Sequence, residues 1–130
     1  LYGLMQYAKN EAVMRNRVVT LENISGSDGR WDQQIRIYVS GDQSTNRAFN
    51  ASVDEELREH TGFNQANLTA FGSAGAQKWL SFRPNGTLDV TGNPVIVLCQ
   101  DGNTGNARSI ALQPSGRITQ PATTPTDCTP

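Results

Sequence analysis

The chain has 130 residues, of which 36% are hydrophobic, and its 12 glycines bring the apolar share close to that of globular proteins. This length suits one domain, residues 1–130, with a sizeable buried core. The net charge of −1 provides no overall attraction to nucleic acid or to an acidic membrane, so a basic binding site would have to be a local patch.

The first segment predicts an amphipathic helix over residues 1–16. Its apolar residues recur at the i, i+3, i+4, i+7 and i+11 positions of a helix: Leu1, Leu4, Met5, Ala8 and Ala12. We expect this stripe to pack on a sheet. Asn16 can adopt the left-handed conformation that ends a helix.

The start of this helix carries none of the usual signals. No Ser, Thr, Asp or Asn cap precedes the stripe, and neither a signal peptide nor a run of 18 apolar residues is visible. We therefore expect the helix to continue upstream of Leu1 in a longer protein.

After residue 16 the hydrophobic period changes from 3.6 to 2, which predicts strands. Residues 17–24 and 31–40 form two candidate strands around a turn at 25–30. In the second strand apolar and polar residues alternate, so we expect a half-buried strand with Tyr38 on its polar side. A polar loop, 41–51, follows.

Residues 52–60 allow two interpretations. Ser52 and Glu55 have the spacing of a capping box, which favours a short helix by local rules. The other interpretation is a strand.

The second half of the chain predicts two hairpins. Residues 77–82 and 86–90 flank the turn sequence RPNG, and residues 93–100 and 107–114 flank DGNTGN. A short strand at 116–120 and an irregular tail at 121–130 complete the chain. The predicted fold class is α+β, with the N-terminal helix packed on an antiparallel β-sheet.

Cys99 and Cys128 are the only cysteines, so they form either two free thiols or one disulfide. A zinc site would need more ligands, and neither cysteine belongs to a Cys-x-x-Cys pair. The Pro/Thr-rich tail cannot anchor itself by burial, and a bridge to a strand would stabilise the fold by roughly 3–4 kcal/mol. This favours the disulfide and an extracytoplasmic compartment.

Three segments resemble one known family: YAKNEAVMRNRVVTL, WLSFRPNGTLDV and ARSIALQPSGRITQ. In this order they are similar to the helix-to-strand junction, the hairpin and the C-terminal strand pair of type IV pilin-like proteins of the FimT/FimU/GspH family. The family's junction typically reads Ala-Arg-x-Glu-Ala-x-x-Arg-x-x-x-Val. The resemblance also implies a strand, rather than a helix, near Leu57.

The resemblance implies that residues 1–16 are the C-terminal half of a longer helix. In this family a short leader is cleaved, and the apolar half of the helix holds the subunit in the inner membrane and later packs in the filament core. Residues 17–120 would then be the sheet region and 121–130 a disulfide-pinned tail. The location implied is a periplasmic head and then a cell-surface pilus of a Gram-negative bacterium.

The implied function is structural. A minor pilin of this type takes part in pilus assembly or priming and joins neighbouring subunits in pili that serve motility and adhesion. The expected partners are other minor pilins and the major pilin. The alternative within the family is a GspH-like pseudopilin of type II secretion, and the tail disulfide favours the pilus.

A second alternative is nucleic-acid binding. Some FimT-like minor pilins bind DNA through a C-terminal Gly-Arg-x-Arg motif, and the matching positions here are Gly116, Arg117, Ile118 and Thr119. The second arginine is therefore absent, although Arg108 on the partner strand could compensate. With a net charge of −1, we expect Arg117 to be a solvated strand-end cation.

No catalytic site is predicted. The single histidine, His60, follows four carboxylates, Asp54, Glu55, Glu56 and Glu59, a setting typical of a solvated surface residue. The sequence contains no nucleophile motif and no dinucleotide-binding motif.

No metal or cofactor is predicted either. Asp42, Ser44 and Asn46 match the first ligands of a calcium loop, but Arg47 takes the glycine position and Val53 the bidentate-acid position.

Overall fold

The computed structural model describes residues 1–24, 28–62 and 67–130. Its elements are α1 (Tyr2–Arg15), β1 (Val19–Asn23), β2 (Ile35–Val39), β3 (Glu55–His60), β4 (Leu68–Gly72), β5 (Trp79–Phe82), β6 (Val95–Gln100), β7 (Asn103–Leu112) and β8 (Ile118–Thr119). The fold class is α+β, as predicted.

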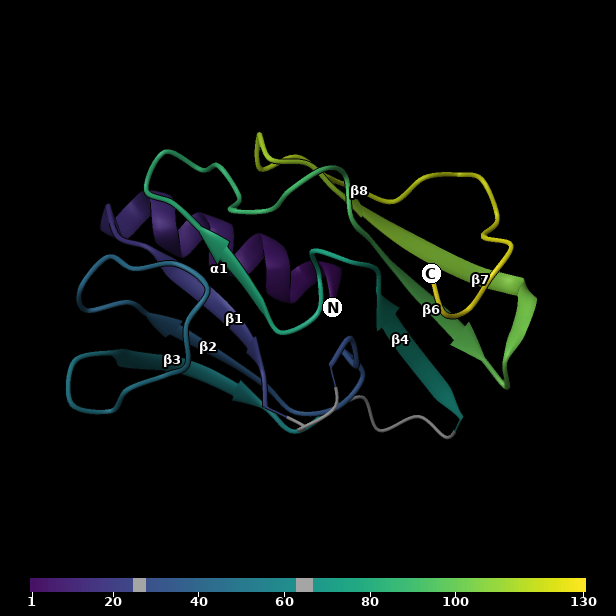
Figure 1. The fold of residues 1–130 in the computed structure, drawn as a ribbon, viewed down its shortest axis with the longest axis horizontal. Helices are drawn as coiled ribbons and strands as arrows, with labels where there is room; N and C mark the ends of the chain where they lie inside the picture. The colour runs from purple at the N-terminus through teal and green to yellow at the C-terminus, as the bar shows by residue number, and fades with distance from the viewer. Residues whose placement is uncertain (25–27, 63–66) are drawn as a thin grey trace.

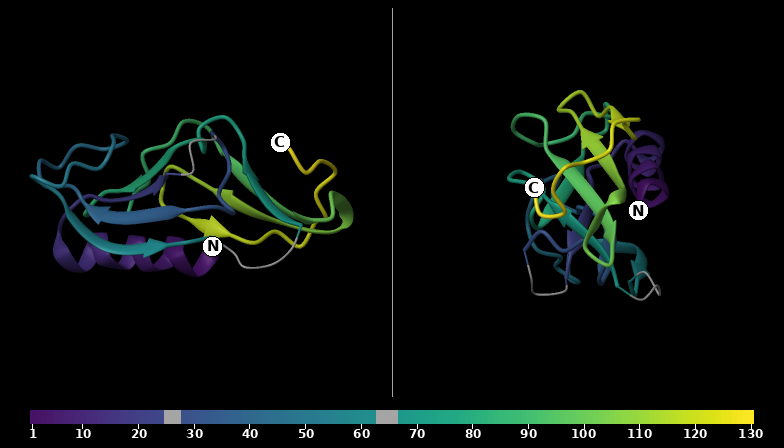
Figure 2. Two further views of the ribbon diagram at one scale, coloured as in Figure 1. Left: turned by 90° about the horizontal axis from the view of Figure 1, so that it is seen from below. Right: turned by 90° about the vertical axis from the view of Figure 1, so that its right-hand side faces the viewer.

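The strands form two antiparallel four-stranded sheets instead of the single sheet expected. Sheet A has the strand order β3-β2-β1-β5, and sheet B has the order β4-β6-β7-β8. Figure 1 shows α1 behind sheet A, with sheet B beside it, and Figure 2 shows that the helix lies along one side of the molecule. Side chains from α1 and both sheets nevertheless share one buried core.

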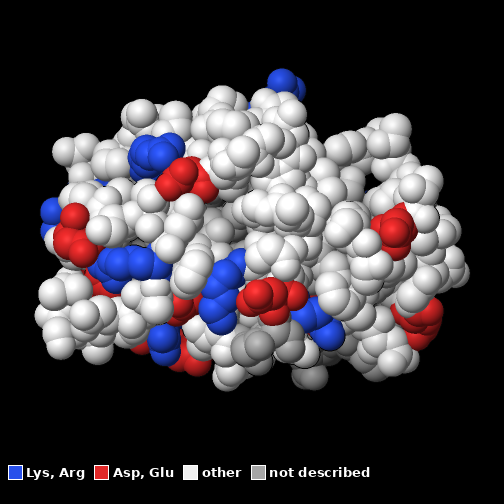
Figure 3. Space-filling view, in the orientation of Figure 1, with Lys and Arg blue, Asp and Glu red and all other residues white. Residues whose placement is uncertain are grey.

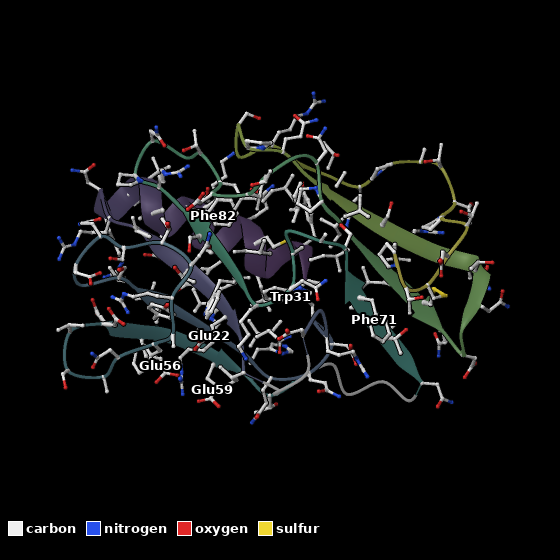
Figure 4. The ribbon with its side chains drawn as sticks, in the orientation of Figure 1. Glu22, Trp31, Glu56, Glu59, Phe71 and Phe82 are labelled. Atoms are coloured by element: carbon white, nitrogen blue, oxygen red, sulfur yellow. A yellow bond between two sulfur atoms is a disulfide. The ribbon has the colours of Figure 1, made fainter. Side chains whose placement is uncertain are left out.

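Trp31 connects the two sheets. It is fully buried, its backbone N–H donates to Ala70 of β4, and its Nε1 donates to the carbonyl of Ala76, each at 2.8 Å. Figure 4 shows the indole between the two sheets. A buried indole needs a hydrogen-bond acceptor, and the Ala76 carbonyl is that acceptor here. The indole ring fills the space where the two sheets diverge.

The helix ends as predicted. Asn16 has φ 55° and ψ 43°, and the backbone N–H of Arg17 donates to the carbonyl of Ala12 at 3.1 Å. This hydrogen bond uses one of the carbonyl groups at the helix end, which lack partners further along the helix. On the helix surface, Arg15 pairs with Glu11 at 2.7 Å in the expected i,i+4 arrangement.

The prediction that β2 is half-buried is wrong at Tyr38, which is 0% exposed. The loop 41–54 folds over the polar side of the strand, where Phe49 packs edge-to-face on the tyrosine at 5.2 Å. The Tyr38 hydroxyl donates to the backbone carbonyl of Arg47. Burial raises the pKa of Tyr38 to about 12.

Residues 55–60 form strand β3, so the helix suggested by the capping box is wrong. The strand pairs with β2 from Val39↔Glu55 to Ile35↔His60. Ser52 lies in a turn just before it. Backbone pairing with β2 therefore outweighs the local helix signal, because it satisfies the donors and acceptors of an entire strand.

The first predicted hairpin forms only in part. Gly86 donates to the carbonyl of Arg83 in the RPNG turn, but the second arm contributes only the isolated bridge Phe82↔Leu88. Leu88 instead donates to the carbonyl of Pro114 at 3.0 Å, so the chain crosses from sheet A towards sheet B. The buried Leu88 side chain joins the shared core.

The second predicted hairpin is present as β6 and β7, with a tighter turn than expected. Asp101 and Gly102 have φ of 56° and 67°, the positive values that a two-residue type I′ turn requires. Strand β7 therefore begins at Asn103 rather than at Ala107.

Strand β4 was not predicted. Its sequence, LTAFG, is short and ends in glycine, and its partner β6 lies about 30 residues further along the chain. Residues 25–27 of the predicted turn at 25–30 lie outside the described residues.

Candidate functional site

The inner face of α1 packs against sheet A. Met5, Ala8 and Ala12 are fully buried, and Leu1 and Leu4 are partly buried against the same core. Two alanines at i and i+4 allow the helix to lie close to β1, because they place no bulk between the helix and the sheet. The five residues of the stripe therefore lie on one face, directed at the sheet.

The outer face of α1 carries an apolar pair that sequence reasoning missed. Val13 is 52% exposed and Met14 is 78% exposed, and Val53 is the only other large exposed hydrophobic residue in the part of the chain that the structure describes. Gly3 and Asn10 share this outer face. The sequence does contain a signal for this exposed pair, because Val13 and Met14 are apolar residues that lie outside the inward stripe.

Two turns lie against α1 on the side of β8. Gly116 has φ +87°, and a Cβ at this position would come within 1.8 Å of the Gly86 carbonyl oxygen. Lys9 of α1 donates from Nζ to the Gly116 carbonyl at 2.9 Å. Gly116 is thus required by a close contact between turns, which gives the glycine of the Gly-Arg pair a structural explanation.

The two candidate nucleic-acid contacts do not form a cationic fork. Arg117 is exposed beside the turn and faces Gln113 of the β7–β8 connection, whereas Arg108 lies five residues before Gln113. In an extended strand, five residues place the Cα atoms of Arg108 and Gln113 about 17 Å apart. The geometry therefore favours two separate surface cations.

The remaining charges are largely paired over sheet A. Figure 3 shows acidic and basic side chains intermixed over sheet A and its loop, and few charges over sheet B. Ion pairs tie Arg36 to Glu56 at 3.3 Å and Arg83 to Asp89 at 3.1 Å. Such neutralised pairs provide no continuous basic surface for a phosphate backbone.

The loop that resembled a calcium site is organised by arginine. Arg47 contacts the carboxylate of Asp42 at 2.9 Å and that of Asp54 at 2.6 Å. Hydrogen bonds from the Arg47 guanidinium hold the pKa of Asp54 below its usual range. Among the described residues no group of three or more His, Cys, Asp or Glu side chains could hold a metal ion.

The carboxylates that precede His60 in the sequence do not gather around it, because most of them have other partners. Asp54 binds Arg47, Glu55 lies within 3.2 Å of Arg15, and the Nδ1 of His60 accepts a hydrogen bond from Gly62 at 3.1 Å. Across the outer face of sheet A, Glu22 accepts a hydrogen bond from Trp79 at 2.9 Å. Figure 4 shows Glu22, Glu56 and Glu59 on this face. Glu55, Glu22 and Glu56 therefore each link neighbouring elements, Glu56 through Arg36.

Cys99 and Cys128 form a disulfide with a Cα–Cα distance of 5.8 Å, which confirms the predicted pairing. Cys99 is buried on β6, in a small cluster with Val97 and Ala107. The bridge holds the tail 121–130 against the outer face of sheet B. Of the described residues, none belongs to a helix long and apolar enough to cross a bilayer.

Comparison with known proteins identifies the family. Residues 1–116 match the family described as Type II transport protein GspH, whereas no curated protein matches the chain. Two crystal structures of the type IV minor pilin FimU from Pseudomonas aeruginosa (strain PAO1) are similar to this fold. One has a TM-score of 0.80 at 28% identity, covering 98% of this chain and 88% of that one. The other has a TM-score of 0.77 at 27% identity, covering 98% and 93%. The chain therefore belongs to the GspH family of type IV pilin-like minor pilins and pseudopilins.

Proposed function

We propose that this protein is a minor pilin of a type IV pilus, a structural subunit that acts in pilus assembly or priming and joins neighbouring pilins. The observation that carries this proposal is the similarity to FimU, which extends over 98% of the chain. Motility and adhesion would then depend on the protein only through the pilus.

The exposed outer face of α1 supports an assembly role. Sheet A already covers the inner face of α1, while Val13 and Met14 remain exposed to solvent. Exposed apolar side chains on an ordered helix are typical of protein–protein contacts. We propose that they contact other minor pilins or the major pilin in the filament.

The family also supports a location. Its members are typically anchored in the inner membrane with a periplasmic head, and a disulfide persists in such an oxidising compartment. We propose the same location for this protein, followed by incorporation into the pilus. Fractionation of cells with an antibody against residues 1–130 tests this, and recovery in the cytosol alone would contradict it.

The assembly role is tested in a strain that lacks the gene, complemented with the wild type, Met14→Glu or the control Thr91→Glu. Thr91 is also exposed but lies far from α1 in the sequence. We expect the deletion to reduce surface pili, and Met14→Glu to lower the amount of this protein in sheared filaments about tenfold. A tenfold loss corresponds to about 1.4 kcal/mol, a modest cost for placing a charge in an apolar contact.

Two outcomes would contradict the proposal. One is normal piliation in the deletion strain, and the other is absence of the wild-type protein from sheared filaments. The match to the GspH family supports a second candidate, a pseudopilin of type II secretion. Lost secretion with intact pili in the deletion strain would establish that candidate instead.

A further inference from the structure

Strand β7 has an edge that its neighbour covers only in part. Strand β8 pairs with β7 at Ala111 and Leu112 alone. The backbone N–H of Leu112 donates towards β6, to Pro94, whereas that of Gln113 donates in the opposite direction, to Arg117. Successive residues of a strand alternate in this way, so Ser109 directs its N–H and C=O away from β6, towards the open edge.

The chain itself explains why pairing stops. Continuing the β7–β8 register from Ala111↔Thr119 places Pro121 opposite Ser109. Proline has no N–H to donate, so it ends a ladder. Within residues 103–130, all of which are described, the tail 121–130 forms no hydrogen bond with β7.

A cleft of about 480 Å³ separates this edge from the tail. Its lining residues come from both sides: Ala107, Arg108, Gln120, Pro121, Ala122 and Thr123. Figure 3 shows a hollow in the upper right, between the tail and sheet B. The Cys99–Cys128 disulfide holds the far end of the tail, so the tail arches over the cleft without filling it.

The edges of β3 and β7 differ in chemistry. Four of the six residues of β3 are charged, the usual protection of an edge strand against pairing with other chains. The two residues of β7 whose backbone groups face the open edge are small and uncharged: Ala107, whose side chain is buried, and Ser109, which is partly buried. Beside them, Arg108 is exposed and forms no ion pair with any described carboxylate, while its Nη1 contacts the Ala107 carbonyl at 3.2 Å.

We propose that this edge of β7 binds a short, extended, acidic segment of a neighbouring pilin subunit by strand addition. The incoming backbone pairs with the free N–H and C=O of Ser109, and its carboxylate pairs with Arg108. Backbone pairing supplies affinity and the charge supplies selectivity, as in other strand-addition complexes. The inference rests on the proposed function, because the partner is a subunit of the same filament.

The test is photocrosslinking in living cells that assemble filaments. A photoreactive residue replaces the exposed Asn106, next to the edge, or Thr91 as a control site. Sheared filaments are collected, and the crosslinked peptide is identified by mass spectrometry. We expect an adduct from position 106, and not from 91, that maps to an extended segment of a pilin containing Asp or Glu.

Two second-site variants then test the chemistry of the edge. Ser109→Pro removes the outward N–H without removing a bond to β6, and Arg108→Glu reverses the charge. Each should lower the yield of the position-106 adduct about tenfold, a loss of about 1.4 kcal/mol. Arg117→Glu, the same change on an exposed arginine outside the cleft, should leave the yield unchanged. Unaltered thermal unfolding of the purified variants shows that the fold is retained.

Each contrary result has a separate meaning. If filaments contain the protein but position 106 gives no adduct, or an adduct with a helix, the inference fails and the proposed function stands. Equal yields in Ser109→Pro and wild type would also overturn it. If the wild-type protein is absent from filaments, both fail.

Discussion

Sheet A and sheet B are stabilised in different ways. Sheet A is covered on one face by α1 and on the other by the loop 41–54, which Arg47 ties down through Asp42 and Asp54. Sheet B shares the core on one face, while its outer face meets a tail held by the Cys99–Cys128 disulfide. Non-covalent contacts therefore suffice for sheet A, and a covalent bond assists sheet B.

The composition of the covering segments explains the difference. The helix contributes Met5, Ala8 and Ala12 to a large core, so burial alone can hold it. The tail contributes only Cys128 to a cluster of Val97, Cys99 and Ala107, with Val95 at its margin. So small an apolar contact cannot offset the entropy of ordering ten residues. The tail therefore depends on its disulfide.

The largest expected effect comes from the helix. Met5→Ala should lower the free energy of unfolding by about 2–5 kcal/mol, because it removes a fully buried side chain and leaves a cavity. Met14→Ala is the matched control on the exposed face and should change stability by less than about 0.5 kcal/mol. Urea unfolding of both variants measures the difference. Equal losses would mean that the two faces of α1 are not distinguished by burial.

The disulfide comes second. Its cysteines are 29 residues apart, so the variant Cys99→Ser/Cys128→Ser should lose about 3–4 kcal/mol in the chain-entropy account. Hydrogen exchange should increase first at β7, in sheet B. Faster exchange in sheet A alone would contradict the division of roles between the two sheets.

The third largest loss of stability is expected from the Arg47–Asp54 ion pair over sheet A. Arg47→Ala leaves the buried Asp54 carboxylate without its cation and should lower the free energy of unfolding by about 2–3 kcal/mol. This loss is smaller than for a fully buried ion pair, because Arg47 is partly exposed. Thermal unfolding provides the measurement. Arg117→Ala, which removes an exposed arginine with no ion-pair partner among the described residues, is the control and should be neutral.

The smallest expected effect is the loss of stability in acid. The pKa of Asp54 is lowered in the folded protein, so its contribution to stability is complete above the unfolded-state pKa of about 3.9 and is lost as the pH falls through the folded-state value. The melting temperature should therefore stay level from pH 7 to about 5 and fall below about pH 4. Arg47→Ala should make this acid-induced fall shallower. An unchanged acid profile in that variant would contradict the role of the ion pair.

Local patterns predicted several elements well. The helix stripe and Asn16 marked α1 and its end, and the sequence DGNTGN marked the β6–β7 hairpin, although its turn is tighter than predicted. These signals succeed because they depend on the backbone preferences of adjacent residues. The sequence analysis predicted the inward face of α1 but not the exposed pair Val13 and Met14 on its outer face.

Long-range contacts decided the rest. The amino-acid sequence alone indicated the α+β class, the inward stripe of α1 and the resemblance to the family, and it favoured one disulfide over two free thiols. Three features became apparent only in the folded chain: the burial of Tyr38, the pairing of residues 55–60 with β2 and the crossing of Leu88 between two sheets. A strand near Leu57 was implied by the family resemblance, but its partner was not. The physical reason is that burial and backbone pairing depend on segments distant in sequence, which local propensities cannot anticipate.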